Sequence, residues 1–250
     1  MKAPENILQE IEQYIFENYK AGDRIITEAE MAEKFGVGRS TIRENMSVLA
    51  ALGLIIRKTT GTYVSEDITG CLTKPLKMIM QLQRSNLTSI MMLRNILEAN
   101  AMVLAAENVT DAELEKLRYI HWKLLNPEYD PQQFIEDDFL FHNTIARISG
   151  NPILVEFISA IRRVLMETSE FHVSVNADPE QRKITCDGHQ RIIDALEERS
   201  TEKALKAIND HFNDLIAVYE TKAMDGAATL PRQALVVLLP ESPLESSEDL

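Results

Sequence analysis

An aspartate and a histidine stand four residues apart in the stretch FIEDDFLFHNTI, which covers residues 134–145 and otherwise has the apolar spacing of an amphipathic helix. Asp138 and His142 both fall on the apolar side of this helix, and their spacing lets the two side chains meet at one point. They could form half of a metal site. They could also form a buried hydrogen-bonded pair, and this helix alone favours that simpler arrangement.

Two further histidines have the same inward placement in later helical stretches. His189 and His211 each share a helix face with several aliphatic or aromatic residues. Three neutral imidazoles and one carboxylate suit Zn²⁺, Ni²⁺ or Mn²⁺ and leave coordination positions for water or a small oxygen ligand. The remaining histidines, His121 and His172, have no matching partner, and we interpret them as structural or surface residues.

Arg94 and Glu98 form another inward pair at the same spacing. One interpretation is a buried ion pair that orders the core. The other places Arg94 close to the cavity, where its guanidinium forks onto the carboxylate of a bound effector. The sequence leaves both open.

The composition restricts the class of protein. The chain has 250 residues, 45% hydrophobic and 26% charged, with no apolar run near the roughly 18 residues that span a bilayer. The N-terminal stretch lacks the apolar block of a signal peptide, so we expect a cytoplasmic protein without a membrane partner. Cys71 and Cys186 stand far apart and show no CxxC spacing, which argues against a disulfide framework or a thiolate metal cluster.

The charge of the chain is unevenly distributed. The net charge is −13, but residues 34–58 carry five basic side chains against Glu44 alone. One short basic island in an acidic chain is typical of a small nucleic-acid-binding head on a larger body that does not bind nucleic acid.

The N-terminal region alternates helix and turn signals. A helix over residues 5–18 is followed by a turn, and Thr27 with Glu30 forms a capping-box pattern at the start of a second helix. The glycines of GVG break that helix, a third follows over about residues 40–52, and LIIRKTTGTYVS predicts a hairpin. This order is typical of a winged helix-turn-helix, in which the second helix of the pair enters the major groove of DNA.

Polar residues crowd the first turn of the predicted third helix and lie off its apolar face. Arginines there can form bidentate hydrogen bonds with guanine or bind phosphates, and a glycine turn in the wing can approach the minor groove. The alternative is a small helical domain whose exposed arginines are only solvated. The residues at this turn are Arg39, Ser40, Thr41 and Arg43.

Residues 21–64 resemble the N-terminal domain of GntR-type bacterial transcription regulators. The GVxRxTxRE core and the LxxxGLI and GTYV flanks occur in order, and the resemblance covers about residues 7–65. It implies that Arg39, Thr41 and Arg43 contact DNA and that Gly61 lies at the wing tip. Many relatives have an arginine on the helix before the turn where this sequence has Ala29, so their operator sequence does not carry over.

The rest of the chain predicts an all-α body. Start signals such as Thr110 with Glu113, and Asp178 before Pro179, recur along it, and no strand-like alternation is found. Seven helical stretches follow one another, at residues 72–84, 87–107, 110–125, 131–149, 152–175, 179–199 and 201–222.

Three blocks of this body resemble the FCD domain, the ligand-sensing domain of the FadR branch of GntR regulators. LRNILEANAMVLAA, DDFLFHNTIARISGNPIL and GHQRIIDALEERSTEKALKAINDHF span nearly all of residues 90–212. Metal-binding members use an Asp, a His four residues later and one His in each of the last two helices. The resemblance therefore implies that Asp138, His142, His189 and His211 hold a divalent metal, and that the effector is a small organic acid.

The last residues differ in texture from the body. The end of the chain is rich in proline, serine and acidic residues, so residues 224–250 are expected to form an acidic, flexible tail. The apolar segment ALVVLL, residues 234–239, is an exception within it. It could dock on the helical body or on a neighbouring subunit.

We therefore predict a mainly α protein with a winged helix-turn-helix over residues 1–66, a linker over 67–71 and a bundle of about seven helices over 72–223. It would be a non-enzymatic transcription regulator, a repressor, that binds an inverted repeat in double-stranded DNA as a homodimer. Arg94 would bind a carboxylic-acid effector beside the metal, which would be zinc, or nickel or manganese. A metal-dependent enzyme and a regulator that senses the metal itself are the alternatives.

Overall fold

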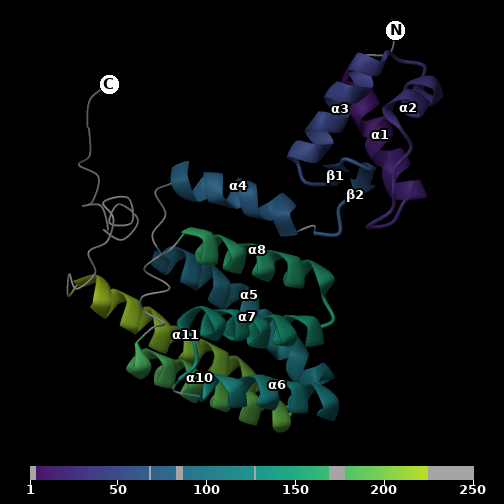
Figure 1. Ribbon diagram of the computed structural model, residues 1–250. Coiled ribbons are helices and arrows are strands. Elements are labelled where there is room, and N and C mark those ends of the chain that lie inside the picture. The colour runs from purple at the N-terminus through teal and green to yellow at the C-terminus, as the bar shows by residue number, and fades with distance from the viewer. Residues whose placement is uncertain (1–3, 68, 83–86, 127, 169–177, 225–250) are drawn as a thin grey trace, which may run out of the picture. The chain divides into compact units, whose positions relative to one another are not determined.

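The computed structural model describes residues 4–67, 69–82, 87–126, 128–168 and 178–224. The chain divides into two compact units, Met1–Lys74 and Pro75–Leu250, and the described part is mostly helical (Figure 1). The mainly α fold class is thus confirmed, with a winged helix-turn-helix followed by a helical bundle.

The first unit, which we call the head, owes its helix-turn-helix to local signals. Thr27 forms both halves of the predicted capping box with Glu30, and Gly36 ends the next helix in the left-handed region at φ 67°. Its elements are α1 (Pro4–Asn18), α2 (Glu28–Phe35), α3 (Arg39–Ala51), β1 (Ile55–Lys58) and β2 (Gly61–Val64).

The head has its own apolar core. α1 contributes Ile7, Ile11 and Ile15, whose spacing of four residues places them on one face. Three residues on the apolar face of α3 are buried in the same core. They are Ile42, Met46 and Leu49.

The predicted hairpin is present and has a third neighbour. β1 and β2 are antiparallel, with Ile55 opposite Val64 and Lys58 opposite Gly61. Arg24, in the segment before α2, forms a β-bridge with Tyr63, and Ile25 N donates to Thr62 O at 2.9 Å. The segment before α2 is therefore attached to the wing.

The start of α4 (Thr69–Leu82) differs from the sequence-based expectation. The helix begins inside residues 67–71, which the sequence predicts to be a linker. Cys71 packs on Gly53 so closely that a Cβ added to the glycine would lie 3.1 Å from its Sγ. This contact is made with a residue distant in the sequence, so the turn-like sequence SEDITG could not indicate it.

The seven helical stretches predicted after the head correspond in order to the seven helices described there. Prolines at the first helical position follow capping aspartates at Asp130 and Asp178, and Thr110 forms a complete capping box with Glu113. The stretch predicted over residues 152–175 is described to Thr168, and residues 169–177 lie outside the described part. After α4 the helices are α5 (Leu87–Asn108), α6 (Asp111–Leu124), α7 (Pro131–Ile148), α8 (Pro152–Thr168), α10 (Pro179–Glu197) and α11 (Thr201–Met224).

The helical body is built around α5. This helix packs against α11, α7 and α8, while α10 packs against α11 and α6 (Figure 1). Phe134, Phe141 and Phe212 are fully buried in the core between them. Residues Ser89–Asn108 are long and apolar enough to cross a membrane, but half of that stretch is buried within the protein. Because Arg94 and Glu98 pair inside it, we interpret α5 as the core helix of the bundle.

The head core gives a first prediction. Ile11→Ala should lower the free energy of unfolding of the head by roughly 2–5 kcal/mol, because Ile11 is fully buried between the helices. Phe16→Ala on the same helix is the control, since Phe16 is 65% exposed and should cost far less. Calorimetric unfolding of both variants measures the difference. Equal losses would show that the face of α1 is wrongly assigned.

Candidate functional sites

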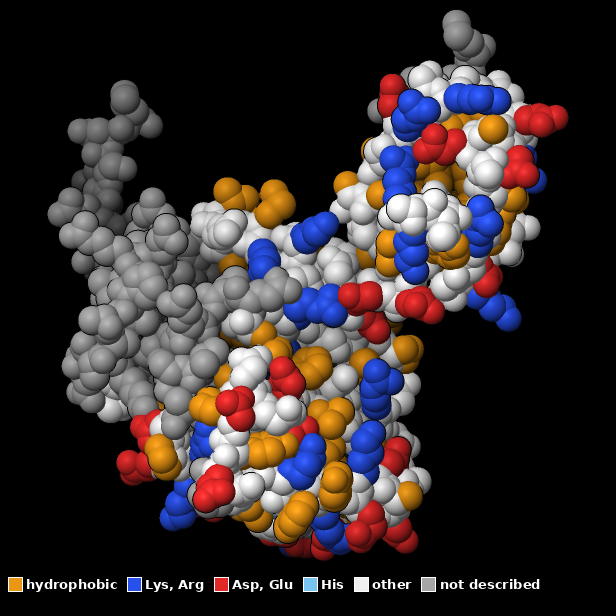
Figure 2. Space-filling view, in the orientation of Figure 1, with side chains coloured by type: hydrophobic (Ala, Val, Ile, Leu, Met, Phe, Trp, Pro, Cys, Tyr) orange, Lys and Arg blue, Asp and Glu red, His pale blue; other side chains and the backbone are white. Residues whose placement is uncertain are grey.

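The N-terminal turn of α3 carries the residues predicted for nucleic-acid contact. Arg39, Ser40 and Arg43 are exposed and Thr41 is half-buried, while the opposite face of the helix is buried in the head core. Gly38 caps α3 without a side chain, so the first N–H groups remain open to an outside acceptor. Figure 2 shows Lys and Arg side chains spread over the visible surface of the head, with Asp and Glu side chains among them.

A single carboxylate connects two arginines of this face. Glu28 Oε2 lies 3.4 Å from Arg43 Nε, and Glu28 Oε1 lies 3.0 Å from a terminal nitrogen of Arg57. Arg57 also donates to the main-chain oxygen of Arg43 at 3.2 Å. The group therefore joins α2, α3 and β1. Arg57 belongs to the basic island of the sequence but is not among the predicted site residues.

The backbone at residue 61 favours glycine. Its φ of 142° is rarely adopted by residues with a side chain, and a Cβ there would lie 2.7 Å from Nε of the flexible Arg24 side chain, which would have to shift. Arg24 thus crosses the wing where Gly61 leaves room. On the same hairpin, Lys58 Nζ lies 4.9 Å from the centre of the Tyr63 ring. The wing therefore presents basic groups from two segments.

In the helical body, three imidazoles from three helices meet. His142 of α7, His189 of α10 and His211 of α11 are buried, and a nitrogen of each lies within 4.8 Å of the others. The Nε2 atoms of His142 and His189 are 3.2 Å apart. Asp138 Oδ1 lies 3.2 Å from His189 Nε2 and 3.6 Å from His142 Nε2. The structure thus brings together all four residues predicted as metal ligands.

The donor set fits a metal ion. Neither ring nitrogen of His211 has a hydrogen-bond partner among the described residues, and Nδ1 of His189 also has none there, although these atoms are buried. Buried polar atoms without partners are costly, and a cation that accepts their lone pairs removes that cost. Three imidazoles and a carboxylate suit a tetrahedral or larger coordination shell for a divalent transition metal.

His142 and His211 are held in the neutral form that metal binding requires. Burial, followed by the positive charge of Arg162, lowers the pKa of His142 to about 4. Burial and the neighbouring His189 and His142 lower the pKa of His211 well below its ordinary value. At neutral pH both rings can therefore offer a lone pair.

A buried charge cluster surrounds the imidazoles. Glu98 Oε2 lies 2.6 Å from His142 Nδ1, the position from which a carboxylate orients a metal-ligating ring. Glu98 Oε1 lies 3.0 Å from Arg94 Nε and 3.4 Å from Arg162 Nε. Arg162 also reaches Asp138 Oδ2 at 3.1 Å. Burial opposes ionisation of Glu98, but Arg94, His142 and Arg162 outweigh it and hold its pKa well below the usual range.

Both arginines of this cluster keep one free nitrogen. Arg94 and Arg162 line a cavity of about 10 Å³ beside Asp138, and the buried Nη2 atom of each has no hydrogen-bond partner within the described residues. The cavity is about the size needed for one water molecule. The arrangement offers two planar cationic groups to an anionic ligand next to the four predicted metal ligands.

A glycine on α10 makes room for one imidazole. A Cβ added to Gly188 would lie 2.2 Å from His211 Nδ1, a distance that real atoms do not adopt. A side chain at this position would keep α10 and α11 apart. Glycine therefore allows the two helices to approach closely enough for His189 and His211 to meet.

Two features of the site were missed from the sequence. Arg162 was not predicted, although it lies among the buried Ile158, Ile161 and Leu165 of α8, and this placement is the signal that could have found it. Glu98 was paired with Arg94 but not with His142. His121 is buried, and its ring centre lies 6.2 Å from that of His189, which agrees with the structural one of the two interpretations given for it. His172 lies outside the described residues.

Comparisons with known proteins match both units. Residues 4–64 match the family described as bacterial regulatory proteins, gntR family, and residues 89–214 match the FCD domain. The chain is 31% identical over 150 residues to the HTH-type transcriptional regulator LutR of Bacillus subtilis, covering 60% of this chain and 68% of that one. It is 27% identical over 237 residues to the HTH-type transcriptional repressor NanR of Cronobacter sakazakii, covering 88% and 86%.

A solved structure has a similar fold. The protein titled Streptococcus agalactiae GntR superposes with a TM-score of 0.66 at 24% identity, over 86% of this chain and 99% of that one.

The metal centre gives a second prediction. Protein purified without chelators should carry about one divalent metal per chain, and His189→Ala should lose it together with part of its thermal stability, because metal binding stabilises the folded state. His121→Gln is the control, because His121 is buried nearby but is not among the three clustered imidazoles. Elemental analysis and thermal unfolding measure both effects. Metal-free wild type, or a metal-free control variant, would contradict the assignment.

Proposed function

The chain belongs to the GntR family of bacterial regulatory proteins with an FCD domain, and we propose that it is a repressor controlled by a small organic acid. Its membership of the family makes it a DNA-binding transcription regulator. The observation that carries the proposal is the pair of buried arginines with free nitrogens beside the four predicted metal ligands. We propose that it acts in the cytoplasm.

The residues of the cluster define the class of effector. A carboxylate would receive hydrogen bonds from the free nitrogens of Arg94 and Arg162, which removes the cost of leaving them unpaired. Asp138, His142, His189 and His211 would hold the metal, zinc or else nickel or manganese. When bound, the metal supplies a positive charge with open positions for a second oxygen of the acid.

The size of the cavity implies a change of shape on binding. A space of about 10 Å³ beside Asp138 is far below the roughly 300 Å³ or more of usual small-molecule sites. The acid can enter only if side chains of α7 and α8 that line the cavity, such as Phe139 and Met166, move apart. Bound and unbound bodies therefore differ in packing, which is the condition for coupling to DNA affinity, typically worth about 1–3 kcal/mol.

The head would use α3 in the major groove and the wing beside it. Arg39, Ser40, Thr41 and Arg43 would meet bases and phosphates, with Gly61 at the wing. We propose a homodimer on an inverted repeat, because two heads related by a two-fold axis read two symmetric half-sites. NanR, similar over most of its length, carries the word repressor in its name, which supports the sign of regulation.

Two alternatives are distinguished by experiment. A metal-dependent enzyme would turn over an organic acid and lose that activity with His211→Ala, but the family match adds no support for it. A regulator of metal alone would change its DNA affinity with metal and not with any acid.

The DNA-binding face gives a third prediction. Arg39→Ala should weaken operator binding by roughly 1–3 kcal/mol, about five- to 150-fold, because an exposed arginine at this helix turn is placed to contact DNA. Lys20→Ala is the control, since Lys20 is exposed between α1 and α2 and is not among the residues predicted to contact DNA. Gel-shift titration at fixed salt measures both. Equal affinity of Arg39→Ala and wild type would reject the role.

The effector site gives a fourth prediction. Mono- and dicarboxylic acids should be screened for a rise in the melting temperature of the metal-loaded protein, and a hit should stabilise wild type but not Arg94→Lys. Lysine keeps the positive charge beside Glu98 but lacks the planar fork that holds a carboxylate. Arg191→Lys is the control, because Arg191 pairs with Asp214 on the surface. An equal rise in the wild type and in Arg94→Lys would exclude Arg94 as the binding group.

A further inference from the structure

A buried amide in the helical body has no hydrogen-bond partner in the part of the chain that the structure describes. Gln181, on the first turn of α10, is 2% exposed, yet neither its amide nitrogen nor its amide oxygen forms a hydrogen bond within the described residues. It lies far along α10 from His189 and contributes nothing to the charge cluster. Burying an amide without partners costs free energy, so a partner for both atoms is missing.

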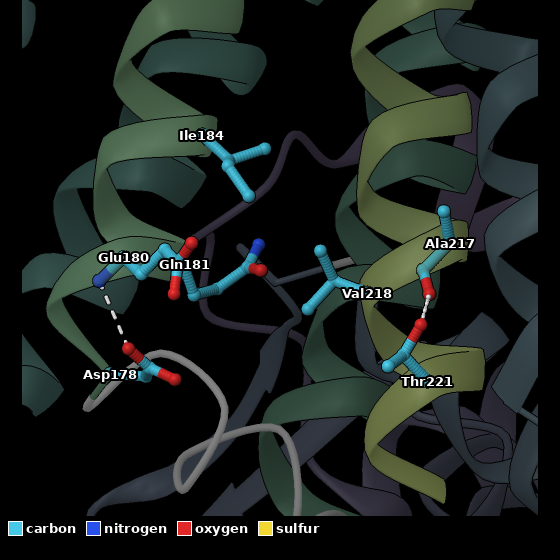
Figure 3. Close-up of a pocket in the computed structure, with 7 residues that line it drawn as sticks. All are labelled: Asp178, Glu180, Gln181, Ile184, Ala217, Val218 and Thr221. Atoms are coloured by element: carbon cyan, nitrogen blue, oxygen red, sulfur yellow. Dashed lines mark hydrogen bonds between the residues drawn. The ribbon is translucent and has the colours of Figure 1, made fainter. Parts of the chain in front are cut away.

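The same amide faces a pocket between α10 and α11. The pocket has a volume of about 300 Å³, and Figure 3 shows Gln181 extending from α10 toward Val218 of α11. Ile184, Ala217 and Val218 provide apolar surface, while Asp178 and Glu180 lie at the α10 side. The volume reaches the lower limit of ordinary ligand sites.

The lining defines the chemistry of the occupant. A primary amide presents a donor group and an acceptor side by side, and the group that matches both is a single residue of an extended chain, whose own N–H and C=O lie on the same side of that chain. Apolar walls favour aliphatic side chains. The two carboxylates disfavour an anion, so the pocket does not suit the organic acid proposed for the metal centre.

We propose that this pocket binds residues 232–239 of the same chain, RQALVVLL, as an extended segment whose main chain pairs with the Gln181 amide. The segment combines the required features: apolar β-forming residues, a main chain with N–H and C=O groups to pair, and a leading cation, Arg232, for the acidic side of the pocket. It is the one apolar run of the C-terminal region that the function of the protein leaves without a role.

The covalent connection favours this occupant over a separate molecule. Thr221 lines the pocket, and α11 is described to Met224, so the chain leaves the helix at the pocket. The eight residues from there to Arg232 can span up to about 26–29 Å, enough to turn back. A tether of this length gives an effective concentration in the millimolar range.

The test asks whether one substitution in the full-length chain raises or lowers the melting temperature. Gln181→Leu should lower the melting temperature by about 2–4 °C and expose the amides of residues 232–239 to hydrogen exchange, because the bound segment loses its hydrogen bonds. If the amide has no partner, Gln181→Leu should instead raise the melting temperature, because an apolar group of similar size removes the cost of burying the amide. Gln190→Leu, an exposed glutamine on α10, is the control for helix propensity.

A second variant changes the proposed segment instead of the pocket. Val236→Asp with Val237→Asp should abolish the same exchange protection, and adding Gln181→Leu to it should cause no further fall in melting temperature. Three results would overturn the proposal. These are a higher melting temperature of Gln181→Leu in the full chain, unprotected amides in residues 232–239 of wild type, and protection that appears only at concentrations where the chain dimerises, which would assign the segment to a second copy.

Discussion

Arg94, Arg162 and Glu98 are buried together beside three imidazoles, with the partly exposed Asp138 at their edge, and the helical body has to keep these charges paired. Arg94 and Glu98 come from α5, Asp138 from α7 and Arg162 from α8. Removal of one member of a buried pair leaves an uncompensated charge and typically costs about 3–5 kcal/mol. The cluster therefore fixes the relative positions of three helices, and the imidazole geometry depends on it through the contact between Glu98 and His142.

Much of the fold follows from local chemistry. Capping boxes at Thr27 and Thr110 and the prolines after Asp130 and Asp178 mark helix starts that depend only on neighbouring residues. The start of α4 and the attachment of Arg24 to the wing could not be predicted, because each depends on a contact with a residue distant in the sequence. Local signals therefore define the helices, whereas their junctions are decided by packing.

The candidate site divides in the same way. Helical periodicity turns Asp138, His142, His189 and His211 inward, and family resemblance groups them, so the sequence alone predicts that they lie close together. Their partners could not be predicted in this way. The apolar spacing of α8 turns Arg162 inward, but which side chain fills the space next to a buried ring depends on rotamers and helix separation. No sequence pattern therefore indicates the contact of Arg162 with Asp138, the contact of Glu98 with His142 or the role of Gly188.

The ion pairs of Glu28 change how the head meets a polyanion. In the free protein one carboxylate already neutralises part of the charge of Arg43 and Arg57. If α3 and the wing meet DNA as proposed, the phosphates must displace that carboxylate in addition to releasing solvent ions. Fewer small ions are then released per arginine, and affinity falls less steeply with salt than the number of basic residues suggests. Binding to non-specific DNA relies on charge alone, so it is weakened most when the arginines are already paired with a carboxylate. An acidic residue at the proposed contact face therefore lowers the overall affinity but raises the selectivity for specific DNA.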